Sequence, residues 1–167
     1  SSDYSADLSA QIGMGFAFAH HFASYDAVEA LTHYRARFKP SPSRSTPWSI
    51  LAVAVVTADT DEEAEYLAQS MDLNRLRRDR GQYFPLPSPE EAMAYPYTEQ
   101  DRIKLSRGRK RLFVGSPATV MAKLQPLITA SQADEVMITA SIYDHEKRKH
   151  AYTLLADAFG LQRSEAA

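Results

Sequence analysis

Apolar positions along the chain gather in three short stretches that alternate with longer amphipathic segments. Residues 48–58 are almost continuously apolar, which is the pattern of a parallel strand covered on both faces. Residues 16–22 and 134–142 are shorter apolar stretches and are also predicted to be strands. The segments that separate these strands are long enough to form helices.

Five of the remaining segments carry helix signals. Gly13 follows the first segment and is expected to end it in the left-handed conformation. Ser24 or Asp26 can cap the second helix, and Thr60 with Glu63 forms a capping-box pattern for the third. The expected helices cover residues 3–12, 24–38, 60–71, 116–130 and 144–159.

Residues 73–111 interrupt this alternation and are expected to form a long loop or insertion. Residues 73–80 are basic and could extend the preceding helix, whereas residues 81–97 combine prolines with aromatic residues. A short helix at residues 90–94 could lie within this loop. Long loops in compact domains are usually either functional or disordered.

Strands that alternate with helices predict an α/β fold with parallel strands joined by right-handed crossovers. At 167 residues the chain can bury one sizeable core, so a single domain over residues 1–167 is expected. The pattern alone fits a piece of a barrel and a doubly wound sheet equally well. A complete (β/α)8 barrel needs roughly 250 residues, so this chain cannot form one by itself.

Composition adds little to this interpretation. A net charge of −2 with 44% apolar residues is ordinary for a soluble protein and gives no reason to expect a nucleic-acid partner. The absence of cysteine, of a signal-peptide pattern and of a run of ~20 apolar residues fits a cytoplasmic protein with no membrane partner. The basic residues at 102–111 are interpreted as a solvated loop, because no nucleic-acid-binding motif accompanies them.

Several short segments, each weakly specific alone, occur together and in one order. They are residues 5–13, 16–22, 34–41, 58–65, 114–117 and 133–137. In this combination the chain resembles the bacterial luciferase-like, flavin-dependent monooxygenases. The resemblance covers nearly the whole chain and implies the C-terminal half of their (β/α)8 TIM barrel, with the predicted strands as strands six, seven and eight.

The resemblance implies an FMN site at the beginning of the first helix. Family members hold the FMN phosphate there, and Ser2 and Ser5 fall on the hydroxyl positions of that site, with Ser1 beside them. A helix start suits an anion, because its backbone amides have no partner within the helix and its hydroxyls can donate hydrogen bonds. The alternative is that Ser2 only caps the helix.

Two histidines end the first predicted strand. Adjacent strand residues face opposite sides, so only one of the two can point into a barrel mouth. The family pattern matches His21 and thereby implies a catalytic role, either a hydrogen bond to flavin or substrate or the transfer of a proton. His20 falls on the variable position. The alternative is that His21 packs beneath a loop, and two adjacent histidines without a suitably spaced carboxylate predict no metal site.

Aromatic residues could line an apolar pocket, or a lid over the flavin, in such an enzyme. The candidates are Trp48, Tyr83, Phe84, Tyr95 and Tyr97. Ordinary loop packing is the alternative for each of them.

The implied reaction is the oxygenation of a small organic substrate by reduced FMN and O2, with the reduced flavin supplied by a separate reductase. The first five strands of the family's barrel have no counterpart in this sequence. An open barrel exposes strand edges and an apolar inner face, so association with a second copy or with a complementary barrel half is expected. The alternatives are a non-catalytic half-barrel that associates in this way and an unrelated doubly wound binding domain.

Overall fold

The computed structural model describes residues 3–161. Contacts between residues divide the chain into two compact units. The first unit holds the residues up to Ala54 together with Lys123–Thr139, and the second holds Val55–Ala122 together with the residues from Ala140 onward.

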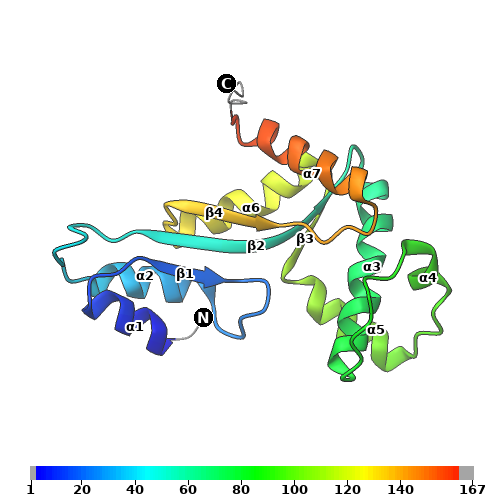
Figure 1. The fold of residues 1–167 in the computed structure, drawn as a ribbon, viewed down its shortest axis with the longest axis horizontal. Coiled ribbons are helices and arrows are strands. Elements are labelled where there is room, and N and C mark those ends of the chain that lie inside the picture. Colours follow the sequence, from blue (N-terminus) through cyan, green and yellow to red (C-terminus); the bar gives the residue numbers. More distant parts are fainter. Residues whose placement is uncertain (1–2, 162–167) are drawn as a thin grey trace. The chain divides into compact units, whose positions relative to one another are not determined.

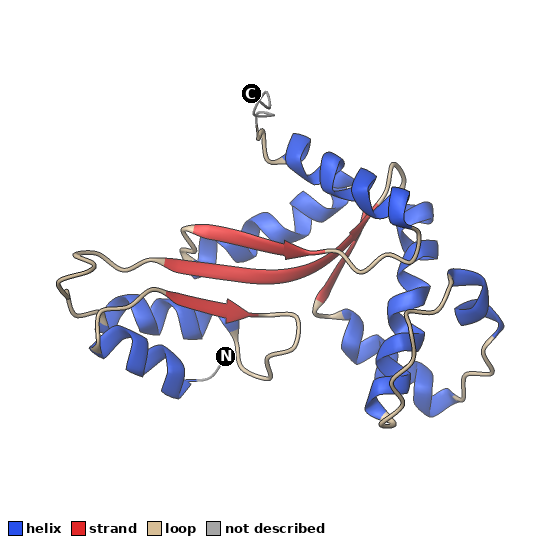
Figure 2. Ribbon diagram, in the orientation of Figure 1, coloured by secondary structure: helices blue, strands red, loops and turns tan. Residues whose placement is uncertain are grey.

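The first unit is built on a parallel sheet. Strand β2 (Ser49–Thr57) lies between β1 (Phe16–Ala19) and β4 (Glu135–Thr139), as Figures 1 and 2 show. Phe18 is paired with Leu51, and Leu51 is paired in turn with Val136. The prediction of three adjacent parallel strands is therefore confirmed.

The two faces of this sheet differ in the size of their side chains. Paired residues of neighbouring strands share a face, and successive residues of a strand alternate between faces. The register therefore places the buried residues Phe16, Phe18, Leu51 and Val53 on one face. Alanines occupy the other face of the same two strands, at Ala17, Ala19, Ala52 and Ala54. Ile50, which is paired with Ala17, lies on this second face as well, so one branched side chain precedes the small ones at Ala52 and Ala54 along β2.

Helices α1 (Asp3–Gln11) and α2 (Ala27–Arg37) pack against each other, and α2 also packs against β1. Tyr34 of α2 is fully buried, with its ring 5.4 Å from that of Phe16. Its hydroxyl donates to the carbonyl of Met14 at 2.8 Å and accepts the backbone N–H of Trp48 at 3.2 Å. Tyr34 therefore joins α2 to the segments that precede both strands.

Glycine and cap residues end and begin these helices as the sequence predicts. Gly13 follows α1 with a φ of 67°, and an added Cβ there would lie 2.5 Å from the Cβ of Ser41. Asp26 caps α2 by accepting the backbone N–H of Glu29 at 2.9 Å.

The second unit contains the end of β2 and strand β3 (Leu112–Gly115), which hydrogen-bonds to β2. Its helices are α3 (Asp61–Asp79), α4 (Pro89–Ala94), α5 (Glu99–Arg109), the start of α6 (Pro117–Ser131) and α7 (His145–Ala158). The core of this unit is formed by Val56, Ala58, Ala64, Leu67, Ala68, Val114, Ala140, Ile142 and Ala151.

Asp61 links the first turns of α3 and α6. Its carboxylate accepts the backbone N–H of Ser116 at 2.6 Å and the hydroxyl of Thr119 at 3.0 Å. The first amides of a helix have no partner within that helix, so a carboxylate from α3 satisfies a donor at the start of α6.

Two expectations from the sequence are wrong. Residues 73–111 are not a long loop, because they hold the last turns of α3 and all of α4 and α5. The short helix expected at residues 90–94 is confirmed as α4. The first strand ends at Ala19 rather than residue 22, because the backbone N–H groups of Phe22 and Ala23 return to the carbonyl of Ala19 in a turn.

Candidate functional site

The serines implied in FMN binding lie at the beginning of the chain. Ser2 lies outside the described residues, whereas Ser5 lies in the first turn of α1 and is half-buried. A helix start directs free amides and a positive dipole end toward an anion. Asp3 occupies the same turn and places a carboxylate next to those amides, which opposes anion binding.

His20 and His21 lie in the turn after β1, so strand alternation does not separate them. The backbone N–H of His20 donates to the carbonyl of Ala52 at 2.8 Å, and Nδ1 of His21 lies 3.2 Å from the same oxygen. A carbonyl oxygen can only accept, so Nδ1 carries the hydrogen in this contact. In the neutral ring Nε2 is then the basic nitrogen, which could accept a proton or a hydrogen bond.

The aromatic residues proposed from the sequence do not form one pocket. Trp48 belongs to the first unit, where its indole N–H donates to Glu135 at 3.0 Å. Tyr83 and Phe84 lie against the guanidinium groups of Arg78 and Arg77. Only Tyr95 and Tyr97 lie together in a pocket, with ring centroids 5.0 Å apart.

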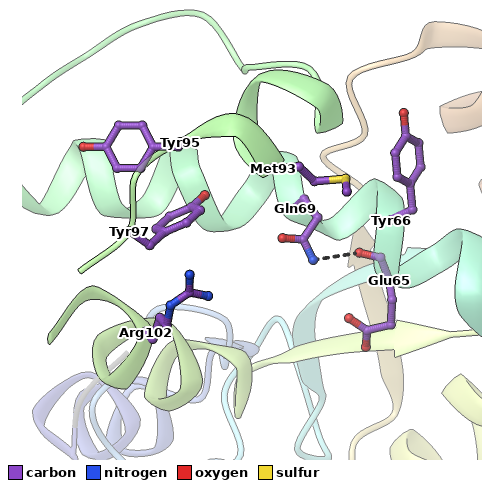
Figure 3. Close-up of a pocket in the computed structure, with 7 residues that line it drawn as sticks. All are labelled: Glu65, Tyr66, Gln69, Met93, Tyr95, Tyr97 and Arg102. Carbon is purple, nitrogen blue, oxygen red and sulfur yellow. Dashed lines mark hydrogen bonds between the residues drawn. The ribbon is translucent and has the colours of Figure 1, made fainter. Parts of the chain in front are cut away.

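That pocket has a volume of about 350 Å³ and lies among three helices of the second unit (Figure 3). Helix α3 contributes side chains from one face, α4 contributes Met93, and α5 contributes Arg102. Its lining residues are Glu65, Tyr66, Gln69, Met93, Tyr95, Tyr97 and Arg102. The lining therefore combines aromatic rings and a thioether with the guanidinium of Arg102, which forms no ion pair within residues 3–161.

A hydrogen-bond network holds one wall of this pocket in place. Arg80 donates to the hydroxyl of Tyr95 and to the carboxylate of Asp101, both at 2.7 Å. Asp101 is buried and forms a reciprocal capping box with Thr98 at the start of α5. Burial by itself would raise the pKa of Asp101, but the hydrogen bonds from Thr98 and the charge of Arg80 outweigh burial and lower it. The charge of Asp101 therefore holds Arg80 in place, and Arg80 in turn holds Tyr95.

Tyr97 is a residue of the pocket whose side-chain hydrogen-bonding group lacks a partner in the described part of the chain. Its hydroxyl is buried and has no hydrogen-bond partner within residues 3–161. Burial raises the pKa of Tyr97 to about 12, and the nearby carboxylate of Asp72 acts in the same direction. The guanidinium of Arg102 lies 5.9 Å from the centre of its ring.

The basic run of the sequence lies mainly on helix α5 and is not a solvated loop. Arg109 forms a bidentate contact with Asp72, at 2.8 Å for the closest pair, and a second ion pair with Glu65 at 3.0 Å. Burial raises the pKa of Asp72, and the contacts with Arg109 act against that rise. Arg109 therefore fastens α5 to α3, whereas Arg102, Lys104 and Arg107 of the same run are exposed.

A second pocket of the same unit, about 470 Å³, is lined by Arg77, Phe84, Pro85, Leu86, Glu91 and Tyr143. Its charges are already paired, because Arg77 forms an ion pair with Glu91 at 2.7 Å and lies over the ring of Phe84. Within residues 3–161, no group of three or more His, Cys, Asp or Glu residues could hold a metal ion. None of the helices in this range combines the length and hydrophobicity needed to cross a bilayer.

Sequence reasoning identified Tyr95 and Tyr97 but missed the other lining residues. Glu65, Tyr66 and Gln69 are spaced as one face of a helix, a spacing that a solvated helix surface shows equally often. Arg102 belongs to a run in which every second or third residue is basic, so nothing in the sequence distinguishes it from its neighbours.

Comparison with known proteins reveals relatives along nearly the entire chain. YceB, an uncharacterized protein of Bacillus subtilis, is 39% identical over 155 residues, which are 93% of this chain and 47% of YceB. A luciferase-like monooxygenase of Escherichia coli is 35% identical over 157 residues, 94% of this chain and 47% of that protein. The chain thus spans about half the length of the curated relatives it matches. No protein-family model matches it.

Solved structures show the same relationship. Apo-MsnO8 superposes with a TM-score of 0.88 at 32% identity, over 98% of this chain and 50% of MsnO8. The long-chain alkane monooxygenase LadA has a TM-score of 0.56 at 15% identity, over 97% of this chain and 40% of LadA. The oxygenating constituent of 3,6-diketocamphane monooxygenase from Pseudomonas putida was solved with FMN. It has a TM-score of 0.50 at 17% identity, over 92% of this chain and 44% of that protein. The predicted fold class, an α/β fold that forms part of a (β/α)8 barrel, is confirmed by these likenesses.

Proposed function

Because the chain belongs to the luciferase-like monooxygenases over the half of their length that it spans, we propose that it forms the C-terminal part of a flavin-dependent monooxygenase. Its proposed reaction is the oxygenation of a small organic substrate. The observation that carries this proposal is the agreement of nearly the whole chain, in sequence and in fold, with proteins of this family. A more distant neighbour of the same fold was solved with FMN, which supports FMN as the flavin.

The residues of the first unit fit a flavin in two respects. Ser5 offers a hydroxyl in the first turn of a helix, where the phosphate of FMN can also receive backbone N–H groups. The alanine face of β1 and β2 also carries Ile50, but positions 17, 19, 52 and 54 hold only methyl groups, so a flat group could approach the sheet closely there. Reduced FMN, supplied by a separate reductase, would contribute the electrons and the oxygen transfer.

The chain's own residues then have defined roles. Ser2 and Ser5 bind the phosphate, and His21 presents Nε2 to the bound molecules while Ala52 holds its other nitrogen. His21 can thereby accept a proton at Nε2 during turnover. The alanine face supports the ring system and keeps water from one side of it.

The test of the phosphate site is the affinity for FMN, measured by quenching of FMN fluorescence on this chain together with the remaining half of the barrel. Each charge-assisted hydrogen bond contributes roughly 1.5–3 kcal/mol, so Ser2→Ala combined with Ser5→Ala should weaken binding by about 100-fold or more. Ser9→Ala, on the same helix but near its other end, is the matched control and should bind like the wild type. Unchanged affinity in the double variant would overturn the phosphate assignment.

The alternative function is a non-catalytic half-barrel that pairs with a second copy or with a complementary half. One observation favours such pairing. Tyr4 and Leu8 of α1 and Ile12, which directly follows that helix, are spaced four residues apart and are 75%, 45% and 51% exposed. Such a stripe lies on one face of the helix and is normally covered in a soluble protein.

Light scattering at micromolar concentration tests this alternative. A dimer, or a complex with the other half, is expected for the wild type, and Leu8→Glu should dissociate it. Asp7→Glu, on the same helix and without a change of charge, is the control. A stable wild-type monomer would contradict pairing, and pairing without any FMN binding by the resulting complex would favour the non-catalytic half-barrel over the enzyme.

A further inference from the structure

The aromatic pocket between α3, α4 and α5 has walls that are fixed without any ligand. Tyr95 is held by Arg80, and Arg80 is held by the buried Asp101. Asp101 in turn begins α5 through its capping box with Thr98. A site whose walls are already ordered binds with a smaller loss of conformational entropy.

The apolar part of the pocket is incompletely covered. Met93 is 63% exposed, although it lines the pocket together with Tyr66, Tyr95 and Tyr97. In Figure 3 its thioether lies near the middle of the labelled side chains. A flat apolar group placed there would contact the sulfur and a tyrosine ring together, and both contacts are favourable.

The charged part of the pocket has one cation without an anion. Arg77, Arg80 and Arg109, which belong to the same group of helices, each form an ion pair. Arg102 forms no ion pair and donates no side-chain hydrogen bond within residues 3–161, and its one contact is with the ring of Tyr97. The carboxylate of Glu65, which also lines the pocket, is engaged by Arg109.

We propose that this pocket binds a small aromatic carboxylate, with its ring against Met93 and the tyrosines and its carboxylate on Arg102. A volume of about 350 Å³ lies in the range of small-molecule sites and suits a molecule of one or two rings. A guanidinium binds a carboxylate through two parallel hydrogen bonds, which gives the site its preference for an anion. This proposal does not depend on the flavin site.

The experiment uses 2-naphthoate as the probe and isothermal titration calorimetry with the full chain. Arg102→Gln should weaken binding by roughly 10-fold or more, because a charge-assisted bidentate contact is lost. Arg107→Gln, a basic residue of the same helix outside the pocket, is the matched control and should bind like the wild type. The neutral analogue 2-naphthalenemethanol should bind the wild type more weakly than 2-naphthoate does. The two compounds should bind the Arg102→Gln variant with equal affinity.

A second measurement needs no variant. In the wild type, 2-naphthoate should shift the methyl resonance of Met93 more than those of Met14 and Met137, which belong to the first unit. Absence of binding at millimolar probe, equal affinity of Arg102→Gln and wild type, or an unshifted Met93 resonance would each overturn the proposal.

Discussion

The guanidinium of Arg35 lies 2.6 Å from the carboxylate of Asp134, although the two residues are 99 positions apart. The same carboxylate oxygen accepts the backbone N–H of Ser49 at 2.7 Å and its hydroxyl at 3.1 Å. Asp134 therefore fixes the beginning of β2 beside the beginning of β4 and ties both to α2.

Replacing Asp134 with Asn should lower the free energy of unfolding by about 1–3 kcal/mol, because the hydrogen bonds from Arg35 and Ser49 to a charged carboxylate are lost. Burial by itself raises the pKa of Asp134, but hydrogen bonds from Arg35 and from the backbone of Ser49 outweigh it and lower the pKa. The resulting stability is present above the unfolded-state pKa of about 3.9 and is lost as the pH falls through the folded-state value.

Urea unfolding between pH 2 and pH 6 measures this contribution. The wild type should lose stability toward low pH more steeply than Asp134→Asn does. Asp157→Asn, at an exposed position of α7, should follow the wild-type curve. Parallel curves for wild type and Asp134→Asn would show that the carboxylate contributes nothing to the acid sensitivity.

Tyr34→Phe removes one hydroxyl from a fully buried site and keeps the ring. Met14 then loses a donor for its carbonyl, and Trp48 loses an acceptor for its N–H. Leaving such groups without partners costs about 1–3 kcal/mol, so the melting temperature should fall clearly. Tyr4→Phe, at an exposed position of α1, removes the same atom and should have no measurable effect.

Gly13 and Gly81 form a matched pair for the cost of crowding. Both have positive φ, at 67° and 72°, so an alanine at either position pays a similar conformational penalty. An added Cβ at Gly13 would lie 2.6 Å from the carbonyl oxygen of Lys39, whereas at Gly81 it would meet nothing within 4 Å. Gly13→Ala should therefore destabilise the protein by about 1–3 kcal/mol more than Gly81→Ala, measured by urea unfolding. Equal losses would locate the whole effect in the backbone conformation.

The proposed role of His21 can be separated from its structural contact. Asn at position 21 can still donate to the carbonyl of Ala52 but has no equivalent of Nε2. If Nε2 accepts a proton in turnover, His21→Asn should lower kcat by about 10²–10⁴-fold while leaving the melting temperature nearly unchanged. His20→Asn should retain most of the activity. A His21→Asn enzyme with normal kcat would leave the residue a purely structural role.

Local signals predicted where several helices begin. Asp26, Thr60 and Asp144 each accept a backbone N–H three residues later, as their positions before apolar periodic segments predicted. The order of the parallel strands followed from the family resemblance, which implied strands six, seven and eight in turn. The apolar pattern of β2 indicated only that both faces of that strand are covered.

Helix α5 could not be predicted by the same reasoning, although the short helix at residues 90–94 was. Helix α5 buries only Asp101 and Gly108, so it has no apolar period to detect. It is fastened instead by polar contacts, such as that of Arg109 with Asp72, which join segments 37 positions apart. The pocket at Arg102 depends on these same contacts, so the sequence could not predict it.

The turn at His20 and His21 shows a further limit. An apolar pattern cannot tell whether a strand continues or turns, because Phe22 suits both. In the structure Phe22 is 68% exposed, and its backbone closes the turn onto Ala19.

The contrast between the two faces of β1 and β2 also has an evolutionary consequence. One face holds the first unit together through the buried side chains of Phe16, Phe18, Leu51 and Val53. Mutations at these positions would therefore lower the stability of the fold. The alanines on the opposite side contribute little volume to that core. Their positions can therefore vary in size to reshape whatever lies against them, and a lineage could acquire new ligand preferences by substitutions at Ala17, Ala19, Ala52 and Ala54 without rebuilding its scaffold.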